Sequence, residues 1–171
     1  MARDEVATLG ALKRHRESLL QPAIARCGGR IVKLMGDGVL VEFGSVVDAV
    51  ECAVAVQLAA IGADDTTAGE HLLLRIGINL GDVIIDDDDI YGDGVNVAAR
   101  LEPLAEPGGI CVSSIVAESV GNRIDVRFRD AGEVHVKNID RPIRIWKWNP
   151  QDQASEAAQR SATAGIVLQV K

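Results

Sequence analysis

The chain has 171 residues, of which 47% are hydrophobic and 25% charged, and its formal net charge is -7 at pH 7. This length suits one domain with a substantial core, and the composition is that of an ordinary globular protein. The negative charge argues against nonspecific attraction to nucleic acid or to anionic membranes, so any phosphate-bearing ligand needs a local site.

Cysteine usage and hydropathy point to a reducing compartment. Cys27, Cys52 and Cys111 are far apart and odd in number, which argues against a disulfide framework or a zinc site. No apolar run reaches the roughly 18 residues that a membrane-spanning helix needs. The opening MARDEVATLG lacks the basic start and apolar stretch of a signal peptide. We therefore expect a cytoplasmic protein without membrane insertion.

The first third of the chain predicts two helices separated by a hairpin. Residues 3–29 carry apolar residues at mostly helical spacing and end at two glycines, which predicts a helix with Pro22 as the point where it would kink. Residues 30–43, RIVKLMGDGVLVEF, form two apolar runs joined by Asp-Gly, one of the strongest hairpin signals. Residues 45–62 begin with the spacing of a capping box and predict a helix.

The remainder interleaves strands with one more helix. LLLRIGINLGDVII (72–85) is too continuously apolar for an exposed edge and predicts a central strand that turns at Gly81-Asp82. GDGVNVAARLEPLA (92–105) predicts a helix, and the segments 108–114, 124–138 and 142–148 predict short strands, the last closing the sheet. This order favours an α/β or α+β sandwich with helices packed on a sheet. Residues 150–171 read as a polar linker or tail whose last residues are too short to form an element alone.

Two charges stand among the apolar residues of the hairpin. Side chains alternate across a strand, so Lys33 is expected on the same face as Ile31 and Met35. An ammonium there is costly unless it is paired or reaches water, and an edge-strand lysine with a solvated head is an equally good explanation. Asp37 suits the turn in its own right, but a carboxylate at such a turn can also ligate Mg²⁺ together with substrate phosphates.

A second group of polar residues surrounds the helix predicted over 92–105. Asn96 and Arg100 are four residues apart, so they lie on one face and can reach the same ligand. The guanidinium suits phosphate oxygens, and the amide both donates and accepts, although a helix arginine is more often simply solvated. The four aspartates 86–89 fit a solvated turn or a weak cation site, and Asp93 fits a helix N-cap.

Taken together, these motifs resemble the catalytic domain of class III nucleotidyl cyclases, especially the bacterial adenylate cyclases. The similarity runs from about Arg3 to Trp148, through GGRIVKLMGDGVLVEF, VVDAVECAVAVQ, LRIGINLGDVI, DIYGDGVNVAARLE, EPGGICVS and VKNIDRPIRIWKW. It implies an α+β, ferredoxin-like cyclase sandwich in which helices pack on a mainly antiparallel sheet. Residues 1–149 would be this domain, truncated at its amino terminus.

The resemblance also implies roles for individual residues. Lys33 and Asp89 would recognise the adenine ring, because together they present donors and an acceptor to its edge. Asn96 would orient the ribose. Arg100 would stabilise the charge that develops on the phosphate while the 3′-hydroxyl attacks.

The remaining implied roles concern the triphosphate, the metal and the assembly. Lys137 would contact the triphosphate, and Asp37 would be one of two metal-binding aspartates for Mg²⁺ or Mn²⁺. The family assembles its sites across a head-to-tail homodimer, with the metal carboxylates on one chain and the side that carries Asp89, Asn96 and Arg100 on the other. Because Met1 stands just before the predicted first helix, the family's first strand, with the other metal-binding aspartate, is expected to be missing from this sequence.

The resemblance therefore implies an adenylate cyclase that converts ATP to 3′,5′-cyclic AMP and pyrophosphate in intracellular signalling. The alternative is a catalytically inactive nucleotide-binding or dimerisation module, because the first metal aspartate is missing. No partnership with nucleic acid is expected.

Overall fold

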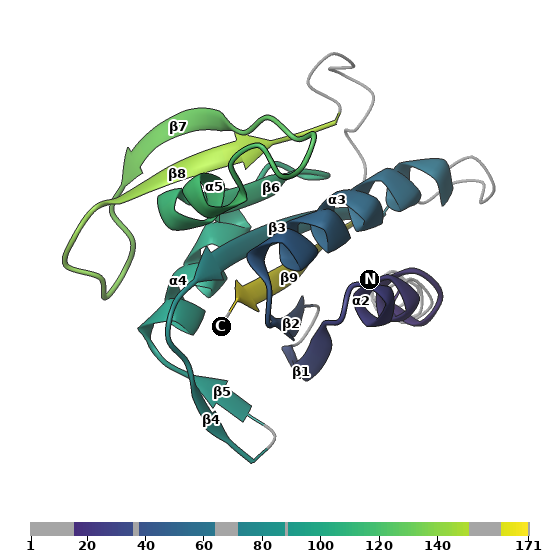
Figure 1. Cartoon of the computed structure of the whole chain (residues 1–171), viewed down its shortest axis with the longest axis horizontal. Coiled ribbons are helices and arrows are strands. Elements are labelled where there is room, and N and C mark those ends of the chain that lie inside the picture. The colour runs from purple at the N-terminus through teal and green to yellow at the C-terminus, as the bar shows by residue number, and fades with distance from the viewer. Residues whose placement is uncertain (1–15, 36–37, 64–71, 88, 151–161, 171) are drawn as a thin grey trace, which may run out of the picture.

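The computed structural model describes residues 16–35, 38–63, 72–87, 89–150 and 162–170 (Figure 1). The helical elements are η1 (Arg16–Leu20), α2 (Gln21–Arg26), α3 (Val46–Ala63), α4 (Asp93–Leu101), η2 (Glu102–Leu104) and α5 (Ser114–Val120). The strands are β1 (Arg30–Met35), β2 (Gly38–Phe43), β3 (Leu72–Leu80), β4 (Ile84–Asp86), β5 (Asp89–Tyr91), β6 (Ile110–Ser113), β7 (Arg129–Val134), β8 (Ile143–Trp148) and β9 (Ala162–Val170).

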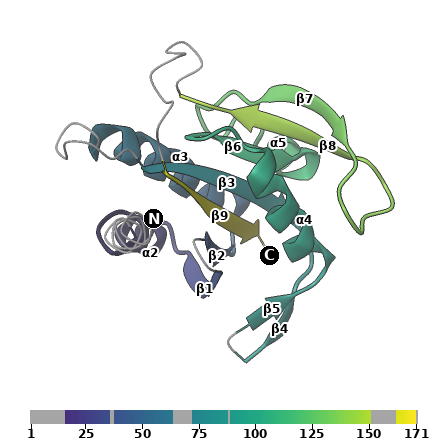
Figure 2. The same ribbon diagram turned by 180° about the vertical axis from the view of Figure 1, so that it is seen from behind.

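The main sheet has seven strands in the order β1-β2-β9-β3-β6-β8-β7. Antiparallel pairing joins β1 to β2, β6 to β8 and β7 to β8. Parallel pairing joins β9 to both β2 and β3, and β3 to β6. The α+β architecture is confirmed, but the sheet is mixed rather than mainly antiparallel. A separate antiparallel ribbon, β4-β5, projects from the body of the molecule (Figures 1 and 2).

Helices cover both faces of this sheet. On one face α2, α3 and α5 contribute to the largest core cluster, which contains Phe43, Val56, Ile76, Ile78 and Leu168 among others. On the other face α4 and η2 cover two smaller clusters, one around Leu40 and Ala98 and one around Leu101 and Cys111. In the parts of the chain that the structure describes, no helix is both long and apolar enough to cross a bilayer.

The sequence patterns that predict where helices begin agree with the structure at α3 and α2 and disagree with it at α4. Ser45 Oγ accepts a hydrogen bond from the Asp48 amide over 3.3 Å, which confirms the start predicted for α3. Pro22 lies in the first turn of α2, directly after the π-helical turn η1, so the helical geometry changes next to the predicted kink. At α4 the N-cap is Gly92 rather than Asp93, which instead forms the first helical residue.

A β-bulge at Val32 changes which way Lys33 faces. The register shifts between Ile31, which pairs with Val41, and Lys33, which pairs with Leu40. Val41 belongs to the core under α3 and Leu40 to the core under α4, so these partners face opposite sides of the sheet. Directly opposed residues share a face, so the prediction that Ile31 and Lys33 point the same way is wrong.

Strand β9 corrects the prediction of a polar tail over residues 150–171 where the structure describes that segment, at residues 162–170, while residues 151–161 lie outside the described residues. Ala162–Val170 instead pair along their length with β3 and along five residues with β2. Ile166, Val167 and Leu168 are at most 4% exposed. The end of the chain is therefore part of the central core, and β9 is the strand that joins the β1-β2 hairpin to the rest of the sheet.

Candidate active site

A small pocket lies where α4 meets the loop between β7 and β8. Its volume is about 110 Å³, and it is lined by Asp93, Asn96, Arg100, Lys137, Asn138 and Ile139. The structure thus brings together three residues that lie up to 41 positions apart in the sequence: Asn96, Arg100 and Lys137. Two cations face one carboxylate there, so the pocket is suited to an anionic group.

Helix α4 supplies one side of the pocket. Asp93, Asn96 and Arg100 are spaced three and four residues apart, which aligns them along one helical face. The opposite face buries Ala98 and Leu101 completely. Arg100 lies in the last turn of α4, where its positive charge interacts favourably with the negative end of the helix dipole. Its position therefore stabilises the helix even without a ligand.

The other side of the pocket is a β-turn in the loop between β7 and β8. The Ile139 amide donates a hydrogen bond to the Val136 carbonyl over 3.2 Å, which places Lys137 and Asn138 at the two corners. Asn138 has a φ of 67°, the left-handed conformation that asparagine tolerates better than most residues.

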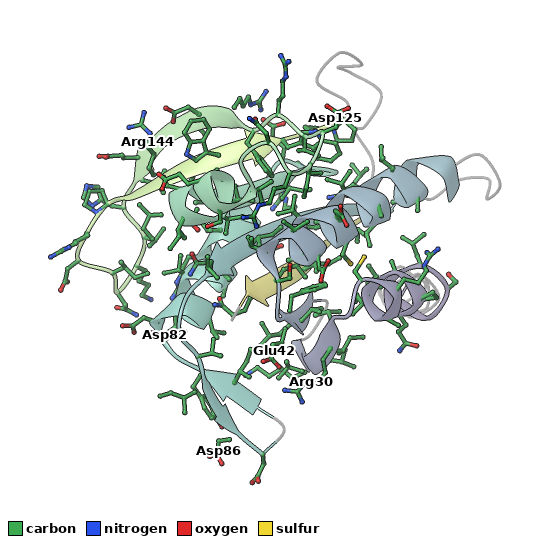
Figure 3. The ribbon with its side chains drawn as sticks, in the orientation of Figure 1. Arg30, Glu42, Asp82, Asp86, Asp125 and Arg144 are labelled. Carbon is green, nitrogen blue, oxygen red and sulfur yellow. The ribbon has the colours of Figure 1, made fainter. Side chains whose placement is uncertain are left out.

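An ion pair ties together the two strands that carry this loop. Arg144 on β8 pairs with Asp130 on β7, and its hydrogen bond lowers the pKa of the Asp130 carboxyl (Arg144 is labelled in Figure 3). Glu133 of β7 faces Arg144 in the strand register.

The predicted base-recognition residues lie on strands that touch each other. Lys33 is exposed on β1, and Asp89 begins β5, which contacts β1. Ile90 of β5 packs in the cluster that contains Leu40, the pairing partner of Lys33. The side chain of Asp89 lies outside the described residues.

Asp86, Asp87 and Asp89 lie at the tip of the β4-β5 ribbon. Asp86 pairs with Asp89 across the turn, and Asp87 has a φ of 52°. Figure 3 shows Asp86 at the end of the ribbon, pointing away from the body of the molecule. Asp86 and Asp87 are exposed there, which agrees with the solvated turn expected for these two aspartates.

Asp37, the predicted metal ligand, lies outside the described residues. Among the residues that are described, no group of three or more histidine, cysteine, aspartate or glutamate side chains is placed to hold an ion. Arginine, lysine and asparagine dominate the pocket, and these groups fit phosphate oxygens rather than a cation.

The buried cysteines are not nucleophile candidates. Burial raises the pKa of the Cys52 thiol and of the Cys111 thiol to about 12. Both thiols therefore stay protonated at neutral pH, and neither lines the pocket.

Three residues of the pocket were not predicted as site residues. Asp93 precedes Asn96 by three positions, so helical spacing could have placed it on the same face. Asn138 and Ile139 carry no such signal, because the fold of a loop decides whether neighbours of Lys137 also face the pocket.

Known proteins are similar to this chain over most of its length. A family model described as the adenylate and guanylate cyclase catalytic domain matches residues 5–148. A protein of Rhizobium meliloti (strain 1021) named "Putative adenylate cyclase 3" is 49% identical over 157 residues, covering 91% of this chain. An "Adenylate cyclase" of Streptomyces coelicolor is 35% identical over 129 residues, covering 75% of this chain.

The solved structures agree with these relatives. The crystal structure of an adenylate/guanylate cyclase/hydrolase from Silicibacter pomeroyi has a TM-score of 0.79 and 47% sequence identity. That comparison covers 85% of this chain and 86% of the other. The chain spans only 27% and 31% of the Rhizobium and Streptomyces relatives, which are much longer proteins.

Proposed function

This chain belongs to the family of adenylate and guanylate cyclase catalytic domains, and on that basis we propose that it converts ATP to 3′,5′-cyclic AMP and pyrophosphate. The observation that carries the proposal is the pocket in which Asn96, Arg100 and Lys137 converge. The names of the Rhizobium and Streptomyces relatives favour adenylate over guanylate as the substrate class.

The reaction needs positioned donors rather than a protein nucleophile. The ribose 3′-oxygen forms a bond to the α-phosphorus, the bond from that phosphorus to the pyrophosphate oxygen breaks, and the hydroxyl proton is released. Negative charge builds on the α-phosphate and on the leaving pyrophosphate. The Arg100 guanidinium and the Lys137 ammonium would stabilise that charge, and the Asn96 amide would hold the ribose in line.

The size of the pocket supports a site completed by a second protomer. Pockets that hold a whole small molecule are usually about 300–1,000 Å³, so 110 Å³ accommodates only part of a nucleotide. In a head-to-tail homodimer the partner would supply the remaining contacts. Ile84 and Tyr91 pair on the projecting ribbon and are 66% and 48% exposed, which provides an apolar surface for such an assembly.

Base and metal recognition complete the proposal. Lys33 and Asp89 would read the adenine edge, and contact between β1 and β5 keeps their strands together. Mg²⁺ or Mn²⁺ at Asp37 would supply Lewis-acid polarisation of the phosphate oxygens when bound.

Product formation by the purified chain tests this proposal. With Mn²⁺ we expect cyclic AMP from ATP and little cyclic GMP from GTP, both measured by chromatography. Asn96→Ala and Arg100→Ala should each lower kcat about 100-fold. Arg127→Ala, which changes an exposed arginine outside the pocket, should leave kcat unchanged.

Two outcomes would count against it. Equal rates in wild type and Arg100→Ala would remove the pocket from the chemistry. ATP binding without any cyclic product would instead favour the alternative, a catalytically inactive nucleotide-binding or dimerisation module.

A further inference from the structure

A buried polar pair ties the first turn of α4 to the sheet. Asn79 lies near the end of β3, Ser113 is the last residue of β6, and they are 6% and 5% exposed. The Ser113 hydroxyl donates a hydrogen bond to Asn79 Oδ1 over 2.7 Å. Asn79 Nδ2 in turn donates to the Gly94 carbonyl over 3.0 Å, and Gly94 is the second residue of α4.

Packing alone does not account for these side chains. A buried amide is costly unless its oxygen and nitrogen are both bonded, and a leucine would fill similar space without that requirement. Asn79 uses both ends of its amide, one toward β6 and one toward α4. A fully bonded network of this kind specifies one arrangement of the elements it joins.

A close backbone contact fixes the other end of the same helix. A Cβ placed at Gly77 would lie 2.6 Å from the Ala98 carbonyl oxygen, so β3 and α4 are nearly in contact there. Gly77 and Asn79 are two residues apart on one strand and therefore face the same side. Asn96 lies between Gly94 and Ala98, and Arg100 lies between Ala98 and Glu102, whose amide nitrogen would be 2.5 Å from the same Cβ.

We propose that Asn79, held by Ser113, is a positioning residue that sets the rotation of α4 so that Asn96 and Arg100 face Lys137. Asn79 does not line the pocket and acts through the Gly94 carbonyl, two residues before Asn96. A shift of about 1 Å in a positioned group can lower a rate about 100-fold. The catalytic consequence rests on the proposed function, whereas the effect on α4 does not.

Three variants separate the bonds of this network. Asn79→Asp keeps an acceptor for Ser113 but sets an oxygen against the Gly94 carbonyl. Asn79→Leu removes both bonds, and Ser113→Ala removes only the bond that orients Asn79.

Gln57 provides a matched control. Its buried amide bridges two backbone carbonyls, those of Leu74 at 2.9 Å and Gly109 at 2.8 Å, and it comes from α3 rather than from the pocket side. Gln57→Met should lower thermal stability as the Asn79 variants do, because it also removes buried hydrogen bonds.

Two readouts decide the inference. In the cyclase assay, Asn79→Asp and Asn79→Leu should lower kcat about tenfold or more while Gln57→Met keeps it within about twofold. In hydrogen exchange on the full chain, Ser113→Ala should speed exchange of the α4 amides more than of the α3 amides. Asn79 variants that fold and keep the kcat of Gln57→Met would overturn the proposal.

The hydrogen-exchange experiment is informative even if the chain has no cyclase activity. If wild type forms no cyclic nucleotide, the proposed function fails, but faster exchange confined to α4 still supports the positioning role. If the Asn79 variants do not fold, Ser113→Ala decides, and uniform exchange across α3 and α4 would overturn the role of the network.

Discussion

Gly77 determines how closely α4 approaches the sheet. A Cβ at this position would lie 2.5 Å from the Glu102 amide nitrogen and 2.6 Å from the Ala98 carbonyl oxygen. Both are backbone atoms, so the helix itself must move. We expect Gly77→Ala to lower the free energy of unfolding by about 2–3 kcal/mol, measured by urea denaturation.

The control for this substitution is Gly44→Ala. A Cβ at Gly44 would have no neighbour within 4 Å, so the same change should be neutral or slightly stabilising. Equal stability of the two variants would contradict the close packing of α4.

Asn138 determines how Lys137 is presented. Its φ of 67° is costly for a β-branched residue and free of cost for glycine. We expect Asn138→Val to weaken ATP binding about fivefold and Asn138→Gly to bind like wild type, as measured by isothermal titration calorimetry. Weaker binding by both variants would show that the asparagine side chain, rather than the turn, matters.

Single residues show what the sequence could and could not predict. The spacing of Asn96 and Arg100 predicted their shared face because helical periodicity is local. The prediction of which way Lys33 faces was wrong, because a bulge breaks strand alternation and no local pattern in the sequence indicates it. The sequence did not indicate the proposed role of Asn79 either, because that role depends on a hydrogen bond from Ser113, which is 34 residues away.

The β4-β5 ribbon provides the exposed apolar surface that we propose for the dimer interface. Ile84 and Tyr91 face solvent on one side of it, while Ile90 on the other side is buried. We expect Ile84→Ser with Tyr91→Ser to raise the dimer dissociation constant tenfold or more, measured by sedimentation equilibrium.

Ile115 on α5 supplies the comparison for this pair. It is 47% exposed, so Ile115→Ser removes a similar apolar surface away from the ribbon and should leave association unchanged. An unaltered constant in the ribbon variant would remove the ribbon from the interface.

Elements with strong local signals were predicted well. Helix α3 has its serine cap and strand β3 its continuous apolar run, and β3 lies inside the sheet as expected. The β4-β5 ribbon was harder to predict from the sequence, because a run of aspartates also fits an isolated solvated loop.

At the scale of the whole molecule, β9 holds the two parts of the sheet together. It buries Ile166, Val167 and Leu168, which contribute roughly 5–9 kcal/mol at about 1.5–3 kcal/mol each. This is comparable with the total stability of a typical domain, about 5–15 kcal/mol. We expect a chain ending at residue 161 to lose cooperative thermal unfolding in calorimetry.

A chain that lacks only Lys171 is the control and should unfold like the full chain. A sharp transition at the wild-type temperature in the shorter chain would contradict the central place of β9. Local patterns could not reveal this strand, because its partners in β2 are more than 100 residues away and its flanking residues are small and polar.

The proposal that this pocket binds the nucleotide is tested most directly by measuring how substitutions in the pocket change the affinity for ATP. Calorimetric titration of wild type, Arg100→Ala, Lys137→Ala and Arg127→Ala compares two pocket cations with an exposed arginine outside the pocket. Losing a charge-assisted hydrogen bond costs about 1.5–3 kcal/mol, so the two pocket variants should bind at least tenfold more weakly and Arg127→Ala should bind normally. Equal affinity in all four proteins would contradict the assignment of this pocket to the nucleotide.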